Sequence, residues 1–433
     1  MSKTIILGGG LAGFSLAHFL DEKTIILEKE KQFGGLCRSF DLNGIKYDIG
    51  PHIMFSKNKE ILGHMLSLTE TNKIKRSNQI FYKNRFIKYP FENNLYALDE
   101  PEKEYCLKEF LNNPYKDFES TNMLQFFLKT FGEGITRLYL QPYNEKIWKF
   151  DPSYMDTQMV DRIPKPPDED IINSAKGISS EGYVHQLYFN YPRNEGIQAL
   201  IDSYAKLIKE KTELLNSVVI NKISKHEETW KIDTDNGIFE TKKLINCMPI
   251  HELIKLIDTP TEIKNVVSNL KYNSIHIILI QAKKDKIGDN FAMTVSDKSV
   301  SFHRLSKVNF FGENYILNKK KSTIMAEITY RPDSYLSTLS KEEILESVVS
   351  DLDRLGLVEK EDITATEIKS FEYAYVIYDT DHRKNADKAL NYLRSIGIES
   401  VGRFAEFEYL NMDAVIERTK KLSDKLNKKE KNG

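Results

Sequence analysis

Three glycines near the start of the chain have the spacing of a loop that holds a phosphate group. Gly8, Gly10 and Gly13 form a G-x-G-x-x-G pattern between the apolar run of residues 3–7 and a helix-like run over residues 14–20. Gly8 permits a tight turn, Gly10 lets the backbone approach a pyrophosphate, and Gly13 lets helix and strand pack closely. The amino end of the helix then stabilises the phosphate charge. The pattern predicts a dinucleotide-binding unit of strand, loop and helix.

A carboxylate at the expected distance supports this interpretation. A second apolar run, TIILE, ends at Glu28, about twenty residues after the first glycine. A carboxylate at this place accepts hydrogen bonds from a ribose hydroxyl, and its charge repels a 2′-phosphate. Because strand, helix and acid are all in place, an accidental glycine turn is the weaker explanation.

The residues after Glu28 favour FAD over NAD as the dinucleotide. The segment KEKQFGGLCRSF adds a second glycine pair, which a cofactor can approach closely, and Arg38, which can reach a phosphate or the flavin edge. The segment GIKYDIGPHIMF then places a Gly-Pro turn before His52 and points that side chain inward. A packed turn histidine is the alternative for His52. A plain NAD dehydrogenase does not need the second glycine pair.

These segments resemble the FAD-dependent amine oxidase superfamily, which includes protoporphyrinogen oxidases and UDP-galactopyranose mutases. GGLCRSF and YDIGPHIMF are similar to the mutase pattern in particular, in which a histidine after Gly-Pro lies beside the flavin. Four later segments extend the resemblance over nearly the whole chain: FIKYPFENNLYAL, NEKIWKFDPSYM, EYAYVIYD and GRFAEFEYLNMDAVI. The last is the most specific, and it is similar to the mutase segment GR-x-AE-aromatic-x-Y-aromatic-D-M.

The resemblance implies FAD as cofactor and gives roles to individual residues. Arg304, in SFHRLSK, would grip a substrate pyrophosphate and stabilise reduced flavin; a strand-end surface arginine is the alternative. Arg403 would lie against the flavin or its phosphates, while Tyr409 and Tyr375 would contact the phosphates of the substrate. The implied catalytic residues are Arg304, His52, Tyr375, Tyr409 and Asn411. The implied FAD-binding residues are Gly8, Gly10, Leu11, Ala12, Gly13, Glu28, Lys29, Gly35, Leu36, Arg38, Gly50, His52, Val219, Cys247, Arg403, Tyr409, Leu410, Asn411 and Met412.

Two kinds of function stay open. The resemblance implies first a UDP-galactopyranose mutase-like enzyme, which interconverts pyranose and furanose forms of a nucleotide sugar for surface polysaccharide synthesis. Its reduced flavin would act as the nucleophile, without net oxidation. Two departures keep open an FAD-dependent oxidoreductase of the amine oxidase or protoporphyrinogen oxidase type. Asn411 stands where the mutases have an aspartate, and their second substrate arginine falls in a run that reads RIPKP here. Lys165, Arg162 or Arg193 could replace that arginine.

The hydrophobic patterns, taken together with the resemblance, predict an α/β fold with three parts. Residues 1–54, 199–250 and 396–433 would form a Rossmann-like FAD-binding domain assembled from discontinuous segments. Residues 55–198 would form an inserted, mostly helical domain, and residues 251–395 a β-sheet substrate domain over the active site. Most of the aromatics in the insertion are expected to pack in its core: Phe126, Phe127, Phe131, Tyr139, Tyr143, Trp148 and Phe150.

The composition and charge of the chain limit the kinds of partner that we expect it to bind. The chain has 433 residues and a formal net charge of −1, so no overall basic field favours nucleic acid. No run approaches the roughly 20 apolar residues that span a bilayer. The 3 cysteines are far apart and the 9 histidines lack metal-ligand spacing, so we expect no disulfide framework and no metal site. We expect a cytoplasmic protein that acts on a small molecule, and the resemblance implies a nucleotide sugar. The sequence leaves a homodimer open.

Overall fold

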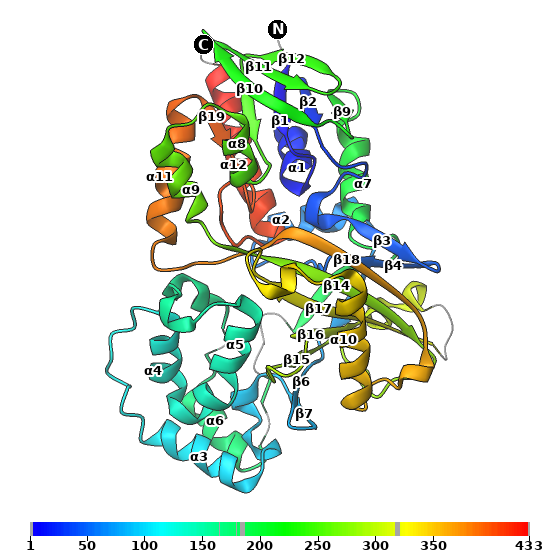
Figure 1. Ribbon diagram of the computed structural model, residues 1–433, viewed down its shortest axis with the longest axis vertical. Coiled ribbons are helices and arrows are strands. Elements are labelled where there is room, and N and C mark those ends of the chain that lie inside the picture. Colours follow the sequence, from blue (N-terminus) through cyan, green and yellow to red (C-terminus); the bar gives the residue numbers. More distant parts are fainter. Residues whose placement is uncertain (1–2, 164, 179, 182–186, 317–320, 432–433) are drawn as a thin grey trace.

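A computed structural model describes residues 3–163, 165–178, 180–181, 187–316 and 321–431 (Figure 1). A parallel sheet lies at the end of the molecule that holds both termini, a seven-stranded sheet lies in the middle, and a group of helices forms the opposite end. The predicted mixed α/β fold with a Rossmann-like sheet is confirmed.

The parallel sheet has five strands in the order β19-β13-β1-β2-β9. Its strands come from four distant parts of the chain: β1 (Thr4–Leu7), β2 (Thr24–Leu27), β9 (Thr212–Leu215), β13 (Leu244–Asn246) and β19 (Ile398–Ser400). β1 is buried along its whole length, which is why it reads as a continuous apolar run rather than an alternating one. A three-stranded antiparallel sheet stands beside it: β10 (Ile220–His226), β11 (Thr229–Thr234) and β12 (Gly237–Thr241).

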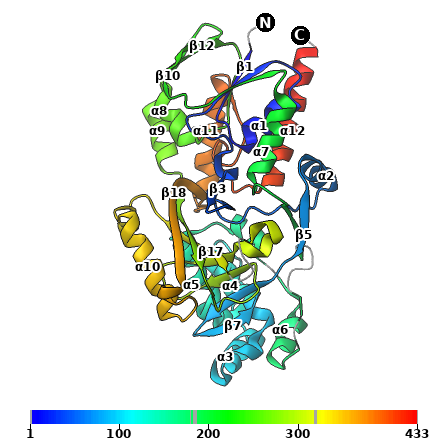
Figure 2. The same ribbon diagram turned by 90° about the vertical axis from the view of Figure 1, so that its right-hand side faces the viewer.

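Helices cover both faces of the parallel sheet, as Figure 2 shows. One group packs around the helix that follows the glycine loop: α1 (Leu11–Phe19), α7 (Gln198–Ile208) and α12 (Met412–Lys431), with α2 (Lys59–Leu68) beside them. The other group comprises α8 (Ile250–Leu256), α9 (Thr261–Ser268) and α11 (His382–Ser395). Both faces of the sheet are therefore shielded from water, as a parallel sheet requires.

The seven-stranded sheet has the order β18-β14-β17-β16-β15-β6-β7, and all its pairs are antiparallel except β15 with β6. The strands are β6 (Asn78–Tyr82), β7 (Arg85–Lys88), β14 (Tyr272–Ala282), β15 (Ala292–Val295), β16 (Arg304–Lys307), β17 (Ser322–Tyr330) and β18 (Ile363–Val376). Strands β6 and β7 come from residues 55–198, so this sheet is not built from residues 251–395 alone. The division of the chain into three domains stays a proposal.

Helices pack on both sides of this sheet. α10 (Lys341–Arg354) buries an apolar stripe against one face, and its first turn is closed by a capping box between Ser340 and Glu343. The helical end of the molecule contains α3 (Glu100–Leu111), α4 (Met123–Ile135), a π-helical turn (Thr136–Leu140), α5 (Gln141–Trp148) and α6 (Asp168–Ala175). Its aromatics pack largely as predicted: Phe126, Phe127, Phe131 and Tyr139 lie in the core.

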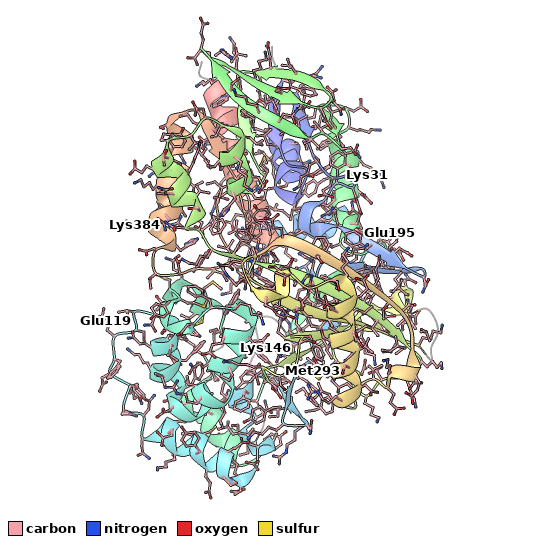
Figure 3. All side chains as sticks on the ribbon, viewed as in Figure 1. Lys31, Glu119, Lys146, Glu195, Met293 and Lys384 are labelled. Atoms are coloured by element: carbon pink, nitrogen blue, oxygen red, sulfur yellow. The ribbon has the colours of Figure 1, made fainter. Side chains whose placement is uncertain are left out.

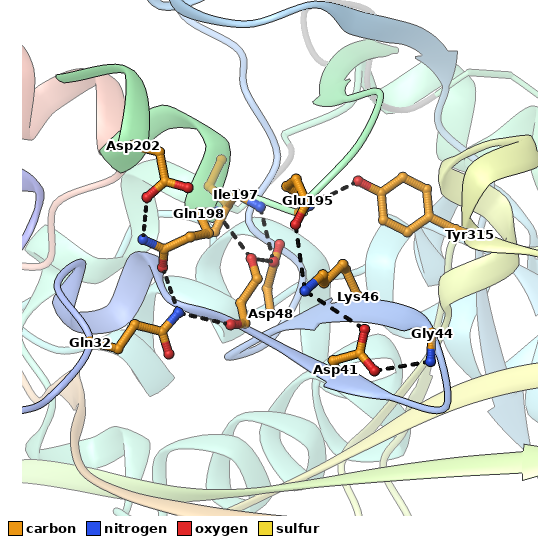
Figure 4. A network of polar contacts seen from close by, with 12 residues as sticks. Gln32, Asp41, Gly44, Lys46, Asp48, Glu195, Ile197, Gln198, Asp202 and Tyr315 are labelled. Atoms are coloured by element: carbon orange, nitrogen blue, oxygen red, sulfur yellow. Dashed lines mark hydrogen bonds and ion pairs between the residues drawn. The ribbon is translucent and has the colours of Figure 1, made fainter. Parts of the chain in front are cut away.

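The buried carboxylate of Asp48 connects the amino-terminal part of the chain to the start of α7 (Figure 4). Two short sheets flank it, one of β3 (Ser39–Leu42) and β4 (Ile45–Asp48), the other of β5 (Thr71–Lys75) and β8 (Tyr188–Pro192). Asp48 accepts hydrogen bonds from Ser39 Oγ at 2.6 Å, from Tyr191 Oη at 2.7 Å and from the Ile197 backbone at 3.1 Å. Burial raises the pKa of Asp48 to about 6, although these hydrogen bonds oppose the rise.

Candidate functional site

A cavity of about 1010 Å³ runs from the carboxyl edge of the parallel sheet to the seven-stranded sheet. Its walls come from the loops after β1, β2 and β13, from β18, and from the segment that leads into α12. Every residue in our two sequence-based sets lines this cavity except Gly13. The cavity therefore brings together residues that lie up to about four hundred positions apart in the sequence.

The glycine loop at one end has the close contacts that its pattern predicts. Gly8 has φ +102°, a conformation that side chains disfavour. A Cβ atom on Gly13 would lie 2.2 Å from the carbonyl oxygen of Gly8, so only glycine lets α1 pack this tightly on the loop. Leu11 and Ala12 form the first turn of α1 and line the cavity. The loop thus presents backbone N–H groups at a helix amino terminus, which is a suitable arrangement for a pyrophosphate.

Glu28 fixes the shape of this loop as well as lining the cavity. Its carboxylate accepts hydrogen bonds from the backbone N–H of Gly9 at 2.8 Å and of Glu30 at 2.9 Å. Lys29 lies beside it in the cavity wall, and Val219 lies across the same end of the cavity. A carboxylate oxygen can accept more than one hydrogen bond, so Glu28 remains able to bind a ribose hydroxyl.

The second glycine pair approaches the first loop directly. The backbone N–H of Gly34 donates to the Gly9 carbonyl at 2.7 Å, and a Cβ atom on Gly35 would lie 3.2 Å from the Cα of Gly10. Arg38 donates to the Gly35 carbonyl at 2.9 Å and forms a 3.2 Å ion pair with Glu30. Leu36 and Cys247 add apolar wall to this part of the cavity. Burial raises the pKa of the Cys247 thiol, so this side chain lines the cavity in its neutral form.

His52 lies in the cavity wall as a neutral imidazole. Its Nδ1 is 3.0 Å from the Gly50 carbonyl oxygen, and because a carbonyl only accepts, this nitrogen carries the proton. Loss of hydration lowers the pKa of His52 to about 4, and Arg403 and Arg304 add to that effect. Nε2 is therefore left as a hydrogen-bond acceptor.

Arg304 does not lie free at a strand end. It begins β16 and forms a two-pronged ion pair with Glu327 on β17, with Nε–Oε1 at 2.5 Å and Nη2–Oε2 at 2.6 Å. Glu327 is fully buried, and a Cβ atom on Gly50 would lie 3.2 Å from its Oε2. Burial opposes the charge on Arg304, but Glu327 outweighs it and raises the pKa of the guanidinium. Glu327 was missed in the sequence, where its one signal is a lone charge within the apolar run TIMAEITY.

The guanidinium of Arg403 lies against the rings of Tyr375, Phe404 and Tyr409 in the cavity wall. The rings of Tyr375 and Tyr409 are stacked with centroids 5.8 Å apart, and the guanidinium carbon of Arg403 lies 4.3 Å from the Tyr409 centroid. Trp148 meets both tyrosines edge-on at 5.8 Å. Trp148 is buried in the core, as expected for most aromatics of the insertion, and it also contacts both tyrosines of this cluster. The close approach of Arg403 to a ring face is a cation–π contact.

The segment that carries Arg403 and Tyr409 is held by neighbours on both sides. Gly402 has φ +116°, and a Cβ atom there would lie 2.7 Å from Cβ of Ala12. The backbone N–H of Tyr409 donates to the Tyr378 hydroxyl at 2.8 Å. Leu410 and Asn411 then lead into α12, which begins at Met412, and all three line the cavity. The amino terminus of α12 therefore opens on the cavity.

Two of the candidates for a replacement of the second arginine, Lys165 and Arg193, do not lie in this cavity wall. Arg193 forms a 2.9 Å ion pair with Glu70 near the surface, and Lys165 lies over the ring of Phe126 at 4.6 Å. The side chain of Arg162 is outside the described residues. Within the described ranges, we find no cluster of His, Cys, Asp or Glu that could hold a metal ion and no helix long and apolar enough to cross a membrane.

Comparison with known proteins shows which domain and which relatives this chain is similar to. The model of an NAD(P)-binding Rossmann-like domain matches residues 6–67. A dTDP-fucopyranose mutase from Escherichia coli is 25% identical over 224 residues, which is 45% of this chain and 56% of the relative. The match thus spans little more than half the length of that relative.

Solved structures match almost the whole chain. A crystal structure of reduced UDP-galactopyranose mutase superposes with a TM-score of 0.89 at 23% identity, covering 98% of this chain and 95% of the other. A putative protoporphyrinogen oxidase from Exiguobacterium superposes with a TM-score of 0.77 at 15% identity, covering 99% of each chain. At these identities the likeness shows a common fold, and it confirms the fold that the resemblance implied.

Proposed function

We propose that the cavity binds FAD and that the protein is a nucleotide-sugar mutase, which interconverts the pyranose and furanose forms of the sugar without net oxidation. The observation that carries the proposal is the cluster of Arg304, Arg403, Tyr375 and Tyr409 at one end of a dinucleotide cavity. The superposition on a reduced UDP-galactopyranose mutase supports the same reaction class.

The residues present fit FAD. A dinucleotide needs close backbone approach along its pyrophosphate, and Gly8, Gly10 and Gly13 supply it. Nε and Nη2 of Arg403 are buried and have no hydrogen-bond partner among the described residues. Buried donors are normally satisfied, so these two groups fit a ligand oxygen or nitrogen that occupies the cavity. The cavity volume of about 1010 Å³ also lies at the upper end of the range for ligand pockets, which suits a ligand as large as a dinucleotide.

The side chains have separate tasks in this proposal. Bound FAD, in its reduced form, would supply the nucleophile. Arg304 supplies positive charge for a leaving diphosphate, and Glu327 holds its guanidinium in one orientation. Burial raises the pKa of Tyr375, which keeps this phenol protonated and able to donate to a phosphate oxygen. The amino terminus of α12 favours negative charge near the flavin.

An FAD-dependent oxidoreductase is the second candidate. The arginines that line the described part of the substrate end are Arg304 and Arg403, and Arg304 is already paired with a carboxylate. That leaves less positive charge for a diphosphate than a pair of unpaired arginines would provide. An oxidoreductase with an uncharged substrate needs less such charge.

One experiment separates the two candidates. The purified protein is reconstituted with FAD, reduced with dithionite without oxygen, and incubated with UDP-galactose or with dTDP-fucose. A furanose product formed only with reduced flavin supports the mutase. Stoichiometric consumption of oxygen or of another acceptor during turnover supports the oxidoreductase. A protein that cannot take up FAD contradicts both.

A further inference from the structure

A buried lysine outside the cavity connects two parts of the substrate end. Lys146 lies in α5 where this helix meets the seven-stranded sheet (Figure 3), and it is 3% exposed. Its ammonium donates a hydrogen bond to the backbone oxygen of Asp297 at 2.6 Å. Among the ion pairs of the described ranges, none includes Lys146. A lysine is rarely buried without a carboxylate partner, so this position requires an explanation.

The two ends of this contact lead directly to site residues. α5 ends at Trp148, whose ring meets Tyr375 and Tyr409. Asp297 lies in the turn between β15 and β16, and Arg304 is the first residue of β16. The hydrogen bond therefore ties the helix that carries Trp148 to the turn that leads into Arg304. On its other side the turn is held by Asp351 of α10, which accepts from the Ser301 backbone at 2.7 Å.

The surroundings of Lys146 make its charge unfavourable. Burial lowers the pKa of Lys146 to about 7, and the nearby positive charge of Lys149 adds to this effect. The negative charges of Asp297 and Asp351 oppose it. His303 is 1% exposed, and neither of its ring nitrogens has a hydrogen-bond partner in the part of the chain that the structure describes. Burial and the neighbouring cations hold the pKa of His303 well below its usual value, so its ring is neutral. The titratable and charged groups that act on Lys146 are Lys149 at the end of α5, Asp297 and His303 in the β15–β16 connection, and Asp351 of α10. Arg304 acts on His303.

An apolar side chain of similar volume would fill this buried position with a smaller free-energy penalty than a lysine, because it has no charge to remove from water. Replacing a buried charged group by an apolar one of similar volume is often neutral or stabilising. A stabilising role therefore does not explain Lys146, whereas its bridging position does.

We propose that Lys146 is a positioning residue: its hydrogen bond to the Asp297 carbonyl sets the placement of Trp148 relative to Arg304 and thereby how closely the site fits a nucleotide diphosphate. The identity of that ligand rests on the proposed function; the placement of Trp148 does not.

The test uses the flavin-loaded protein labelled with fluorotryptophan. The chain has 2 tryptophans, Trp148 and Trp230, so fluorine NMR gives one resonance for each. Trp230 lies in β11, beside the parallel sheet and far from α5, and it serves as an internal reference (Figure 1). Lys146→Met removes the donor while keeping the side-chain length. The matched control is Lys298→Met, because Lys298 joins the same turn to the same helix through an exposed ion pair with Glu145.

We expect Lys146→Met to shift or broaden the Trp148 resonance and to leave that of Trp230 unchanged. The dissociation constant for UDP, measured by calorimetry, should rise about tenfold, and the thermal midpoint should stay equal or rise. Lys298→Met should change none of these quantities. In the unsubstituted protein, the Trp148 resonance should move between about pH 6 and pH 8, as the charge of Lys146 changes.

An unchanged Trp148 resonance in Lys146→Met overturns the proposal, as does a lower thermal midpoint with an unchanged UDP affinity. If Lys146→Met does not fold, the pH titration of the unsubstituted protein decides, and a resonance that does not move overturns the proposal. If UDP binds neither protein, the proposed function fails, while the Trp148 resonance still decides the role of Lys146.

Discussion

Arg304 and Glu327 are direct cross-strand partners on β16 and β17, and their side chains meet in a parallel, two-pronged ion pair. The carboxylate is fully buried, whereas 27% of the Arg304 side chain is exposed to the cavity. Such a fork leaves one guanidinium nitrogen, Nη1, outside the pair and holds the arginine rigidly. Glu327 thus fixes the direction in which Arg304 can offer its remaining donors.

Glu327→Ala should destabilise the protein strongly. Removing one partner leaves the guanidinium in a partly buried position without its counter-charge, and this costs about 3–5 kcal/mol for a buried pair. Urea unfolding measures the loss. Glu213→Ala is the control, because Glu213 forms an exposed 2.7 Å pair with Lys3 and should lose at most about 1 kcal/mol. Equal losses for the two variants would contradict the buried-pair argument.

Under the proposed function, Gly13→Ala should abolish FAD binding, because the new Cβ would lie 2.2 Å from the Gly8 carbonyl oxygen and must displace the glycine loop. The matched control is Gly63→Ala in α2, where nothing lies within 4 Å of the added atom. That substitution should stabilise the helix by about 0.5–1 kcal/mol. Retained flavin absorbance and thermal stability measure both effects, and a yellow Gly13→Ala protein would show that the loop tolerates the displacement.

Alanine substitutions at two glycines with the same backbone conformation distinguish the stability cost of steric crowding from the cost of backbone strain. Gly196 and Gly356 both have φ +64°, but a Cβ atom on Gly196 would lie 2.3 Å from Ser39 Oγ and 2.7 Å from Asp48 Oδ1. Nothing lies within 4 Å of the same atom on Gly356. Gly356→Ala should cost about 1 kcal/mol for the left-handed conformation, and Gly196→Ala about 1–3 kcal/mol more for the crowding. Chemical denaturation measures the difference in the free energy of unfolding between the two variants. That difference should vanish if the hydrogen-bonded residues around Asp48 can move to make room for the added methyl group.

The local parts of the site could be predicted because short segments determine them. The spacing of Gly8, Gly10 and Gly13 gives a turn, a close approach and a helix start within a few residues. The position of Asn411 just before α12 is likewise local, because it depends only on where the following residues begin a helix. The roles of these residues in binding and catalysis stay predictions.

The remaining contacts depend on strand register and on packing between distant segments, which a sequence pattern does not contain. Glu327 faces Arg304 only because β16 and β17 pair in one register. Trp148 reaches Tyr409 only because α5 packs on β17, and in the sequence it was one aromatic among many. Lys146 reads as an ordinary helical lysine, since its burial arises from the sheet that covers it.

The stability of the protein should rise with pH above neutrality because of Lys146. Burial lowers the pKa of this amine from 10.5 to about 7 in the folded state, while the unfolded chain keeps the proton up to its ordinary value. Between these two values the unfolded state binds more protons, so the free energy of unfolding increases as pH rises. The penalty for the ammonium is therefore present below neutral pH and disappears above about pH 10, with a size of at most about 5 kcal/mol.

Lys146→Met removes this dependence. Its advantage over the unsubstituted protein should be largest at about pH 6 and should shrink by pH 9, as the native amine loses its proton. Urea unfolding at both pH values, with Lys298→Met as the exposed control, measures the difference. A constant gap between Lys146→Met and the unsubstituted protein across this range would show that the amine at Lys146 does not titrate there.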